Sequence, residues 1–163
     1  MDSHLLTDTQ IEPIDLSPQL RAAAEAKDAA VLNALLDPLP YSEALRELLS
    51  LTPEERDVVL SLVSSDLAAQ LIEEAPHEMG AELIERLETS RAVEILDELD
   101  SDIQADLLGD MEDKDAEAIL SEMEAEDAAD VRRLVEYEDD TAGGLMMSEV
   151  FKFADTQTVG NVL

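Results

Sequence analysis

The chain has 163 residues, and 41 aspartate and glutamate residues against 10 lysine and arginine residues give it a formal net charge of −31. Such an excess of carboxylates repels phosphate backbones and anionic lipid headgroups, which argues against nucleic acid and membrane surfaces as partners. Cysteine is absent, so disulfides, thiolate catalysis and the usual zinc sites are excluded. An apolar fraction of 45% nevertheless predicts a folded core rather than a disordered acidic chain.

The sequence carries no signal for membrane insertion or for catalysis. No apolar run approaches the roughly 18 residues that a membrane-spanning helix needs, and residues 1–18 lack the basic and then apolar order of a signal peptide. There is no Ser/His/Asp order, no glycine-rich phosphate loop and no nucleophile beside a base. We therefore expect neither an enzyme nor a segment that inserts directly into a membrane.

The N-terminal part of the chain predicts a tail and three helices. Residues 1–16 are expected to form a flexible tail. Two short helices are predicted within residues 18–36, with a break near Lys27, because a Ser-Pro pair favours the start of the first helix. The sequence Asp-Pro-Leu-Pro then stops the second helix, and a third is expected over residues 41–50.

From Leu51 onward the sequence repeats every twelve residues, seven times over, from LTPEERDVVLSL to MEAEDAADVRRL. Two columns of this repeat are apolar throughout. Position one holds Leu51, Val63, Ala75, Leu87, Leu99, Met111 and Met123, and position nine holds Val59, Leu71, Leu83, Ile95, Leu107, Ile119 and Val131. Together with a mostly apolar position ten and a small position six, these columns indicate an apolar stripe on a helix and not strand alternation.

Twelve residues do not continue a single long helix, so each block is predicted to be one short helix followed by a turn. Positions two to four offer capping oxygens at Thr52, Thr89 and Asp100, with acids in the first turn. Small residues at position six, such as Gly80, let neighbouring helices stack. We predict an all-α fold over residues 17–137, a right-handed superhelix of about ten short helices.

The sequence YEDDTAGGLM, which begins at Tyr137, ends the repeat. An eighth block would place Gly143 and Gly144 at positions nine and ten, where glycine cannot fill the core. We therefore predict an acidic linker over residues 138–147. Residues 148–163 read as a short strand, a turn and the start of a helix, and they are expected to begin a second domain that the chain truncates.

The acidic superhelix, followed by YEDDTAGGLM and a segment ending in TVGNVL, resembles the cytosolic N-terminal domain of MgtE magnesium transporters and the start of the cystathionine-β-synthase (CBS) domain after it. The resemblance covers residues 18–163. It implies a cytoplasmic regulatory domain of an inner-membrane transporter, whose partners are the CBS domain and the transmembrane pore of the same full-length protein, within a homodimer. It also implies that Mg²⁺ binds between the domains at high concentration, draws them together and favours the closed pore.

The same resemblance implies particular Mg²⁺ ligands: the carboxylates of Asp102 and Asp106 and the backbone carbonyl of Gly144. Asp102 and Asp106 are four residues apart and share one helical face, where their mutual repulsion is relieved by a bound cation. An acidic position that faces the CBS domain in the family is Gln70 in this chain. Since an amide oxygen is a weaker Mg²⁺ partner than a carboxylate, this departure puts one bridging site in doubt.

Other interpretations of these residues stay open. Acid pairs at the same spacing recur, as at Glu78 and Glu82, so Asp102 and Asp106 can equally be a solvated surface, and the Gly-Gly pair can be only a helix stop. His77 is expected to be a surface or capping residue and not a ligand. The alternative function is a helical-repeat scaffold for protein interactions, related to flagellar motor switch domains. That scaffold predicts an exposed apolar groove and no preference for Mg²⁺ over general ionic strength.

Overall fold

The structure is a computed structural model, and it describes residues 15–137, 141 and 146. Within this part of the chain all regular structure is α-helical, in ten short helices. They are α1 (Ser17–Glu25), α2 (Ala29–Leu36), α3 (Tyr41–Leu49), α4 (Pro53–Leu62), α5 (Ser65–Glu73), α6 (His77–Glu85), α7 (Thr89–Leu96), α8 (Ser101–Gly109), α9 (Asp113–Glu122) and α10 (Ala125–Val135). The all-α prediction of about ten short helices is confirmed, and the break near Lys27 falls between α1 and α2.

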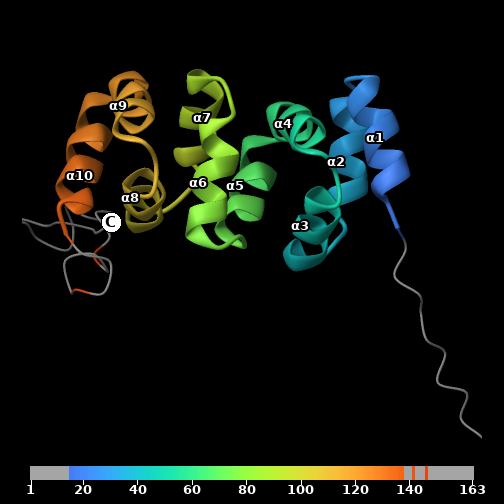
Figure 1. Cartoon of the computed structure of the whole chain (residues 1–163), viewed down its shortest axis with the longest axis horizontal. Helices are drawn as coiled ribbons and strands as arrows, with labels where there is room; N and C mark the ends of the chain where they lie inside the picture. The colour runs from blue at the N-terminus through green and yellow to red at the C-terminus, as the bar shows by residue number, and fades with distance from the viewer. Residues whose placement is uncertain (1–14, 138–140, 142–145, 147–163) are drawn as a thin grey trace, which may run out of the picture.

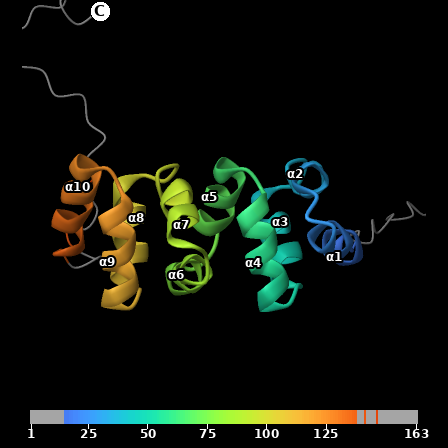
Figure 2. The same ribbon diagram turned by 90° about the horizontal axis from the view of Figure 1, so that it is seen from above.

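The helices follow one another along the long axis of the molecule, with α1 at one end and α9 and α10 at the other (Figures 1 and 2). Apart from the neighbours α1 and α2, the most extensive packing joins helices that are next but one in the sequence: α8 with α10, α7 with α9, α5 with α7, and α6 with α8. Each twelve-residue block therefore contributes one helix, and alternate helices stack to bury a continuous core. None of the helices in the described ranges has the length and the apolar character needed to cross a bilayer.

The core follows the columns of the repeat. Every residue at position nine is buried, and so is every residue at position one except Leu87, which is half-buried. Position ten is buried in the first six blocks and exposed in the seventh, where the residue is Arg132. The apolar stripe that the sequence predicts is therefore the stripe that the fold buries.

At position six of the third block, α6 and α8 approach one another closely. Gly80 in α6 lies so near α8 that a Cβ atom there would stand 2.8 Å from Cδ2 of Leu107. The alanines at this position in α5, α7 and α10 are buried as well, whereas Ala116 in α9 is only half-buried. The fifth block breaks the pattern, because its position six holds a polar residue, Gln104, that is also buried.

The predicted helix caps are confirmed in part. Thr52 and Glu55 form a reciprocal capping box at the start of α4, with Glu55 N to Thr52 Oγ1 at 3.3 Å and Thr52 N to Glu55 Oε2 at 2.8 Å. The prediction is wrong at α7, where the cap residue is Glu88 and Thr89 already belongs to the first helical turn. Asp100 does occupy the cap position of α8, but its side chain accepts no hydrogen bond from the first turn.

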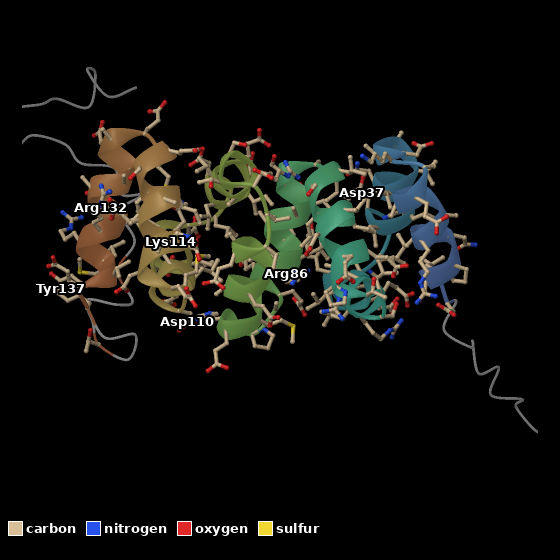
Figure 3. The ribbon with its side chains drawn as sticks, turned by 45° about the horizontal axis from the view of Figure 1, so that its top comes forward. Asp37, Arg86, Asp110, Lys114, Arg132 and Tyr137 are labelled. Carbon is tan, nitrogen blue, oxygen red and sulfur yellow. The ribbon has the colours of Figure 1, made fainter. Side chains whose placement is uncertain are left out.

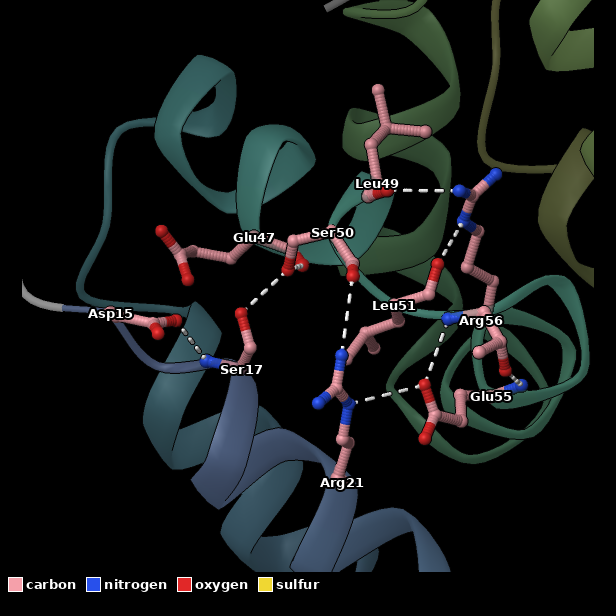
Figure 4. Close-up of polar contacts among 10 residues, drawn as sticks. Asp15, Ser17, Arg21, Glu47, Leu49, Ser50, Leu51, Glu55 and Arg56 are labelled. Carbon is pink, nitrogen blue, oxygen red and sulfur yellow. Dashed lines mark hydrogen bonds and ion pairs between the residues drawn. The ribbon is translucent and has the colours of Figure 1, made fainter.

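Arginine side chains donate hydrogen bonds to backbone carbonyls at the C-terminal ends of several helices. Arg56 donates to the carbonyl oxygens of Leu49 at 2.8 Å and Leu51 at 3.1 Å, at the end of α3 (Figure 4). Arg91 in α7, with a side chain only 14% exposed, donates to the carbonyl of Leu60 near the end of α4 at 3.0 Å. Leu49 and Leu60 lie in the last turns of α3 and α4, where backbone carbonyls have no partner within the helix. The guanidinium groups satisfy these carbonyls and tie successive blocks together.

A buried carboxylate fixes the start of α1 against α3. Glu47 is only 6% exposed, and its Oε2 accepts a hydrogen bond from the backbone N–H of Leu16 at 3.0 Å. Its Oε1 is 3.2 Å from the guanidinium of Arg46, and the hydroxyls of Ser17 and Ser50 lie 2.7 Å apart beside it. Figure 4 shows the contact between Ser17 and Ser50, with Glu47 nearby, at the junction of the two helices. Because the carboxylate is both paired and hydrogen-bonded, its burial is tolerated.

Candidate metal-binding surface

The two implied carboxylate ligands lie in α8. Asp102 is in the first turn of the helix and Asp106 follows one turn later, so both belong to the same face, and both are half-buried. Oδ1 of Asp102 accepts a hydrogen bond from the backbone N–H of Ile103 at 3.0 Å. The structure thus places the pair as the spacing predicts, at the surface of a short helix.

His77 joins this pair from the neighbouring helix. It is the first residue of α6, and its Nδ1 lies 3.5 Å from Oδ2 of Asp106, with side-chain exposures of 53% for His77 and 21% for Asp106. The prediction of a surface residue is confirmed, whereas the capping position itself belongs to Pro76. Sequence reasoning missed the contact with Asp106, because it joins position three of one block to position eight of another two blocks later.

The described residues do not complete a metal cage by themselves. No group of three or more His, Asp or Glu side chains in the described ranges is placed to hold a metal ion. Mg²⁺ prefers six oxygen ligands and keeps several of its waters, so one or two carboxylates can hold it when water and another chain segment supply the rest. The chemistry of Asp102 and Asp106 therefore suits a shared site. Gly144, the third implied ligand, and the predicted linker and CBS start lie outside the described residues, apart from single positions in the linker.

The surface around α8 is dominated by carboxylates. Between Asp97 and Asp130 the only basic residue is Lys114, which is exposed on α9 (Figure 3). Partial desolvation raises the pKa of Asp97 above its ordinary value, although the residue as a whole is exposed, and the nearby charges of Asp127, Glu124 and Glu98 raise this pKa further. A cation that approaches this end of the molecule therefore relieves repulsion that the fold has built in.

Gln70, the other residue that the resemblance singles out, lies in α5 and not in α8. Gln70 is half-buried in α5 and makes no side-chain hydrogen bond among those found in the described residues. It carries no charge, so α5 contributes less than α8 to the negative surface at this position.

These features define a class of protein: an acidic, all-helical repeat domain with carboxylates exposed on one of its helices. A sequence profile of the MgtE intracellular N domain matches residues 39–140, and the chain belongs to this family. No curated protein matches the chain.

Two solved structures share the fold. The cytosolic domain of the Mg²⁺ channel MgtE in complex with ATP is 31% identical over 81% of this chain and 54% of that one, with a TM-score of 0.68. The soluble part of a magnesium transporter is 22% identical over 90% of this chain and 58% of that one, with a TM-score of 0.70. The chain thus spans little more than half the length of the structures that it matches.

Proposed function

We propose that this chain is the Mg²⁺-sensing regulatory part of an MgtE-type magnesium transporter, on the cytoplasmic side of the inner membrane. At high Mg²⁺ it closes onto the CBS domains of the same protein, in a homodimer, and so favours the closed pore. Membership of the MgtE N-domain family is the observation that carries this proposal. The accumulation of carboxylates around α8 supports it, because a neighbouring acidic module is repelled unless cations screen both surfaces.

Within this proposal, Asp102 and Asp106 supply carboxylate oxygens toward a site shared with the CBS domain, and the linker supplies the carbonyl of Gly144. The half-buried position of both carboxylates leaves them reachable from outside α8. Since Mg²⁺ carries the remaining coordination as water, the shared site needs no further ligand from the helices. His77 lies beside Asp106 and limits the directions from which a partner can approach it.

The test is a titration of Mg²⁺ into a longer chain that contains these residues and the complete CBS pair. We expect the radius of gyration from small-angle scattering to fall and protease cleavage near residues 138–147 to slow, in a way that NaCl of matched ionic strength does not reproduce. The double variant Asp102→Asn/Asp106→Asn is expected to shift the midpoint to a Mg²⁺ concentration about tenfold higher.

A matched control removes two charges elsewhere. Asp113 and Glu122 are exposed acids of α9 without an ion pair among those found in the described residues. The variant Asp113→Asn/Glu122→Gln has the same net charge as the α8 variant and is expected to leave the midpoint unchanged. Equal shifts in both variants would show that Mg²⁺ acts only as a general counterion, and the absence of compaction in the parent chain would remove the proposal.

The scaffold alternative expects a continuous apolar groove. The large exposed apolar side chains of the described residues gather instead toward the two ends of the helical row, and they are Val31, Tyr41, Val135, Tyr137 and Met146. No residue of α4 to α9 is among them. This distribution favours the cation-sensing proposal over a central docking groove.

A further inference from the structure

The helix α2 has an unusual composition for a helix at the surface. Its sequence, AAVLNALL, contains no charged residue, whereas each of the other nine helices in the described ranges carries at least one. Ala30, Val31 and Ala34 are exposed and Leu35 is half-buried, and their spacing places all four on one face. Val31 is 42% exposed. Because a helix that is apolar all round is normally buried, this outer face indicates a surface that another element covers.

The single polar residue of α2 is already used within the fold. Asn33 is half-buried, and its Nδ2 donates to the backbone carbonyl of Ala29 at 2.7 Å. Its Oδ1 accepts a hydrogen bond from the backbone N–H of Ser64, at the start of α5, at 3.0 Å. The side of α2 that carries Leu32 and Leu36 is buried, and the helix packs against α1 and α4. The outer face therefore offers water neither a charge nor an unused amide.

The repeat shows what normally lies on this face. The ten helices of the described residues begin at regular intervals of twelve residues, so the blocks extend back to α1 and Val31 holds position five of its block. In later blocks position five faces the helix two blocks earlier. Arg91 donates to the hydroxyl of Ser65 in α5 at 2.9 Å, and Asp127 lines a cleft together with Gln104 of α8. The face around Val31 is therefore the one on which a helix from two blocks earlier would pack.

The pattern of the repeat does not supply such a helix from this chain. The block before α1 would cover residues 3–14, which lie outside the described residues, and it has Glu12 at position ten. From α1 to α9, position ten is apolar and buried in every block. Asp8 likewise stands at position six, which in later blocks is mostly small and buried. The end of a helical repeat needs a polar outer surface or a cover, so we expect the cover of α2 to come from another chain.

The distribution of charge favours a second copy of this chain as the cover. Helices α1 to α3 together carry three acids and two arginines, whereas the segment from Asp97 to Asp130 carries fifteen acids and one lysine. The two groups of helices lie at opposite ends of the row (Figures 1 and 2). Copies with a charge of −31 each repel one another least where they meet through an uncharged helix at the less acidic end. A basic partner is attracted to the acidic helices instead.

We propose that the outer face of α2 packs against the same face of a second copy of this chain, across a two-fold axis. Ala30 and Ala34 let the two helix backbones approach closely, and Val31 and Leu35 supply the apolar side chains beside them. The same residues serve both sides, as a two-fold contact requires. The contact goes beyond the proposed function, in which no part of the N domain is assigned to holding the homodimer together.

The size of this face sets the expected strength of the contact. The eight residues of α2 span only about 12 Å. A stable interface buries roughly 800 Å² on each partner, so isolated chains are expected to associate weakly. In a full-length homodimer the second copy is held nearby, at an effective concentration on the order of millimolar, and the contact is populated there.

The first experiment measures association of the 163-residue chain itself by sedimentation velocity. Between about 20 µM and about 1 mM, the average mass is expected to rise from that of a monomer toward that of a dimer. The rise should be larger at about 0.5 M NaCl than at about 0.05 M, because salt screens the repulsion between copies. An interface of ion pairs responds to salt in the opposite direction. A monomer at the highest concentration in both salts would overturn the inference.

The second experiment uses two matched variants. Val31→Lys is expected to weaken association about tenfold or more, because the contact would have to bury a charge. The residue is exposed in the single chain, so the thermal midpoint from circular dichroism should change little. Val135→Lys is the control, since it makes the same change at a 39% exposed valine at the end of α10. Both variants lower the net negative charge equally, so equal weakening of association in both would also overturn the inference.

The third experiment locates the contact. The chain has no cysteine, so Asp37→Cys, at the exposed C-terminal end of α2 (Figure 3), introduces a single position for a nitroxide label. Mixed with an isotope-labelled parent chain, this variant is expected to broaden the NMR signals of α2 in the parent chain before those of α5 to α10. Broadening confined to α8 to α10 would overturn the inference.

A nitroxide on Ser3→Cys tests the other occupant, the N-terminal segment of the same chain. At about 20 µM, where the chain is expected to be a monomer, this label should leave the signals of α2 unchanged. Broadening of α2 by this label would show that residues 1–14 cover the face and would overturn the inference. The proposed closure onto the CBS domains would stand in every case, because it is measured on the longer chain with other variants.

Discussion

Arg86 at the end of α6 forms a two-point ion pair with Asp57 of α4, with Nε to Oδ1 at 2.9 Å and Nη2 to Oδ2 at 2.7 Å. The hydrogen bond and the charge of Asp57 raise the pKa of the Arg86 guanidinium above its already high ordinary value. The helices α4 and α6 share little other packing, so this pair bridges a gap in the stacking of alternate helices. Its geometry is the planar fork that suits arginine and not lysine.

We expect Arg86→Gln to lower the free energy of unfolding more than Asp57→Asn does. Both variants lose the ion pair, whose contribution is small at an exposed site and is weakened by salt. Arg86→Gln also makes a chain of charge −31 more negative, whereas Asp57→Asn relieves it. Urea unfolding of both single variants and the double variant, at low salt and at about 1 M NaCl, measures the difference, which shrinks as salt screens the charges. An equal loss in both variants would contradict this account.

The α1–α2 turn contains a strained residue whose replacement is expected to stabilise the fold. Lys27 has a φ of 52° and follows α1 in a left-handed conformation, with Lys27 N bonded to the carbonyl of Ala24 at 3.0 Å and Asp28 N bonded to that of Ala23 at 2.9 Å. For a residue with a side chain this conformation costs about 1 kcal/mol, which glycine avoids. Lys27→Gly should therefore raise the thermal midpoint, and Lys27→Ala, which loses the same charge but keeps a Cβ, should not.

Two glycines provide opposite outcomes from the same substitution. A Cβ at Gly80 would stand 2.8 Å from Cδ2 of Leu107, which is 1% exposed and has no room to move away. The overpacking outweighs the gain in helix propensity, so Gly80→Ala is expected to lower the free energy of unfolding by about 1 kcal/mol. At Gly109, in the last position of α8, a Cβ meets nothing within 4 Å, and Gly109→Ala should stabilise by roughly 0.5 kcal/mol. Chemical denaturation of the two variants in parallel tests the sign of each effect.

The number of helices and the burial pattern could be predicted, because the length of the repeat indicates one and its apolar columns indicate the other. Twelve residues provide one helix and one turn, and the position-nine column marks the buried stripe in every block. The start of α4 was equally predictable, since the capping box of Thr52 and Glu55 is a local pattern. Thr89 shows the limit of such local signals, because a hydroxyl one residue too late falls inside the helix instead of capping it.

The polar contacts between blocks were not predictable. Arg91 reaches the carbonyl of Leu60 across 31 residues, and His77 reaches Asp106 across a similar separation, so no local pattern announces either contact. Gln104 did carry a signal, since it alone interrupts a column of small residues after the first block. Its meaning depends on the acids that the α7–α8 turn and α10 bring beside it, which only the packing of α8 against α10 shows.

The raised pKa of Asp97 gives a pH dependence whose sign can be stated. In the folded chain the carboxyl holds its proton to higher pH than its ordinary value of 3.8, so the folded state binds more protons than the unfolded state in the range between the two pKa values. This group therefore lowers stability as pH rises through that range, and its unfavourable contribution is complete above the folded pKa. Below the ordinary value the contribution is absent, because the carboxyl is protonated in both states.

Asp97→Asn is accordingly expected to raise the thermal midpoint at neutral pH and to leave it unchanged near pH 3. The comparison is made between the variant and the parent chain, since Asp15 and Glu55 have lowered pKa values and give the whole molecule an opposing dependence. Saturating MgCl₂ should reduce the advantage of the variant at neutral pH, because cations near these acids screen the repulsion from Asp127, Glu124 and Glu98 that the substitution also removes. A lower thermal midpoint for the variant than for the parent at neutral pH without Mg²⁺ would contradict this account. It would mean that Asp97 stabilises the α7–α8 turn by some other contact and that its charge does not lower the stability of the fold.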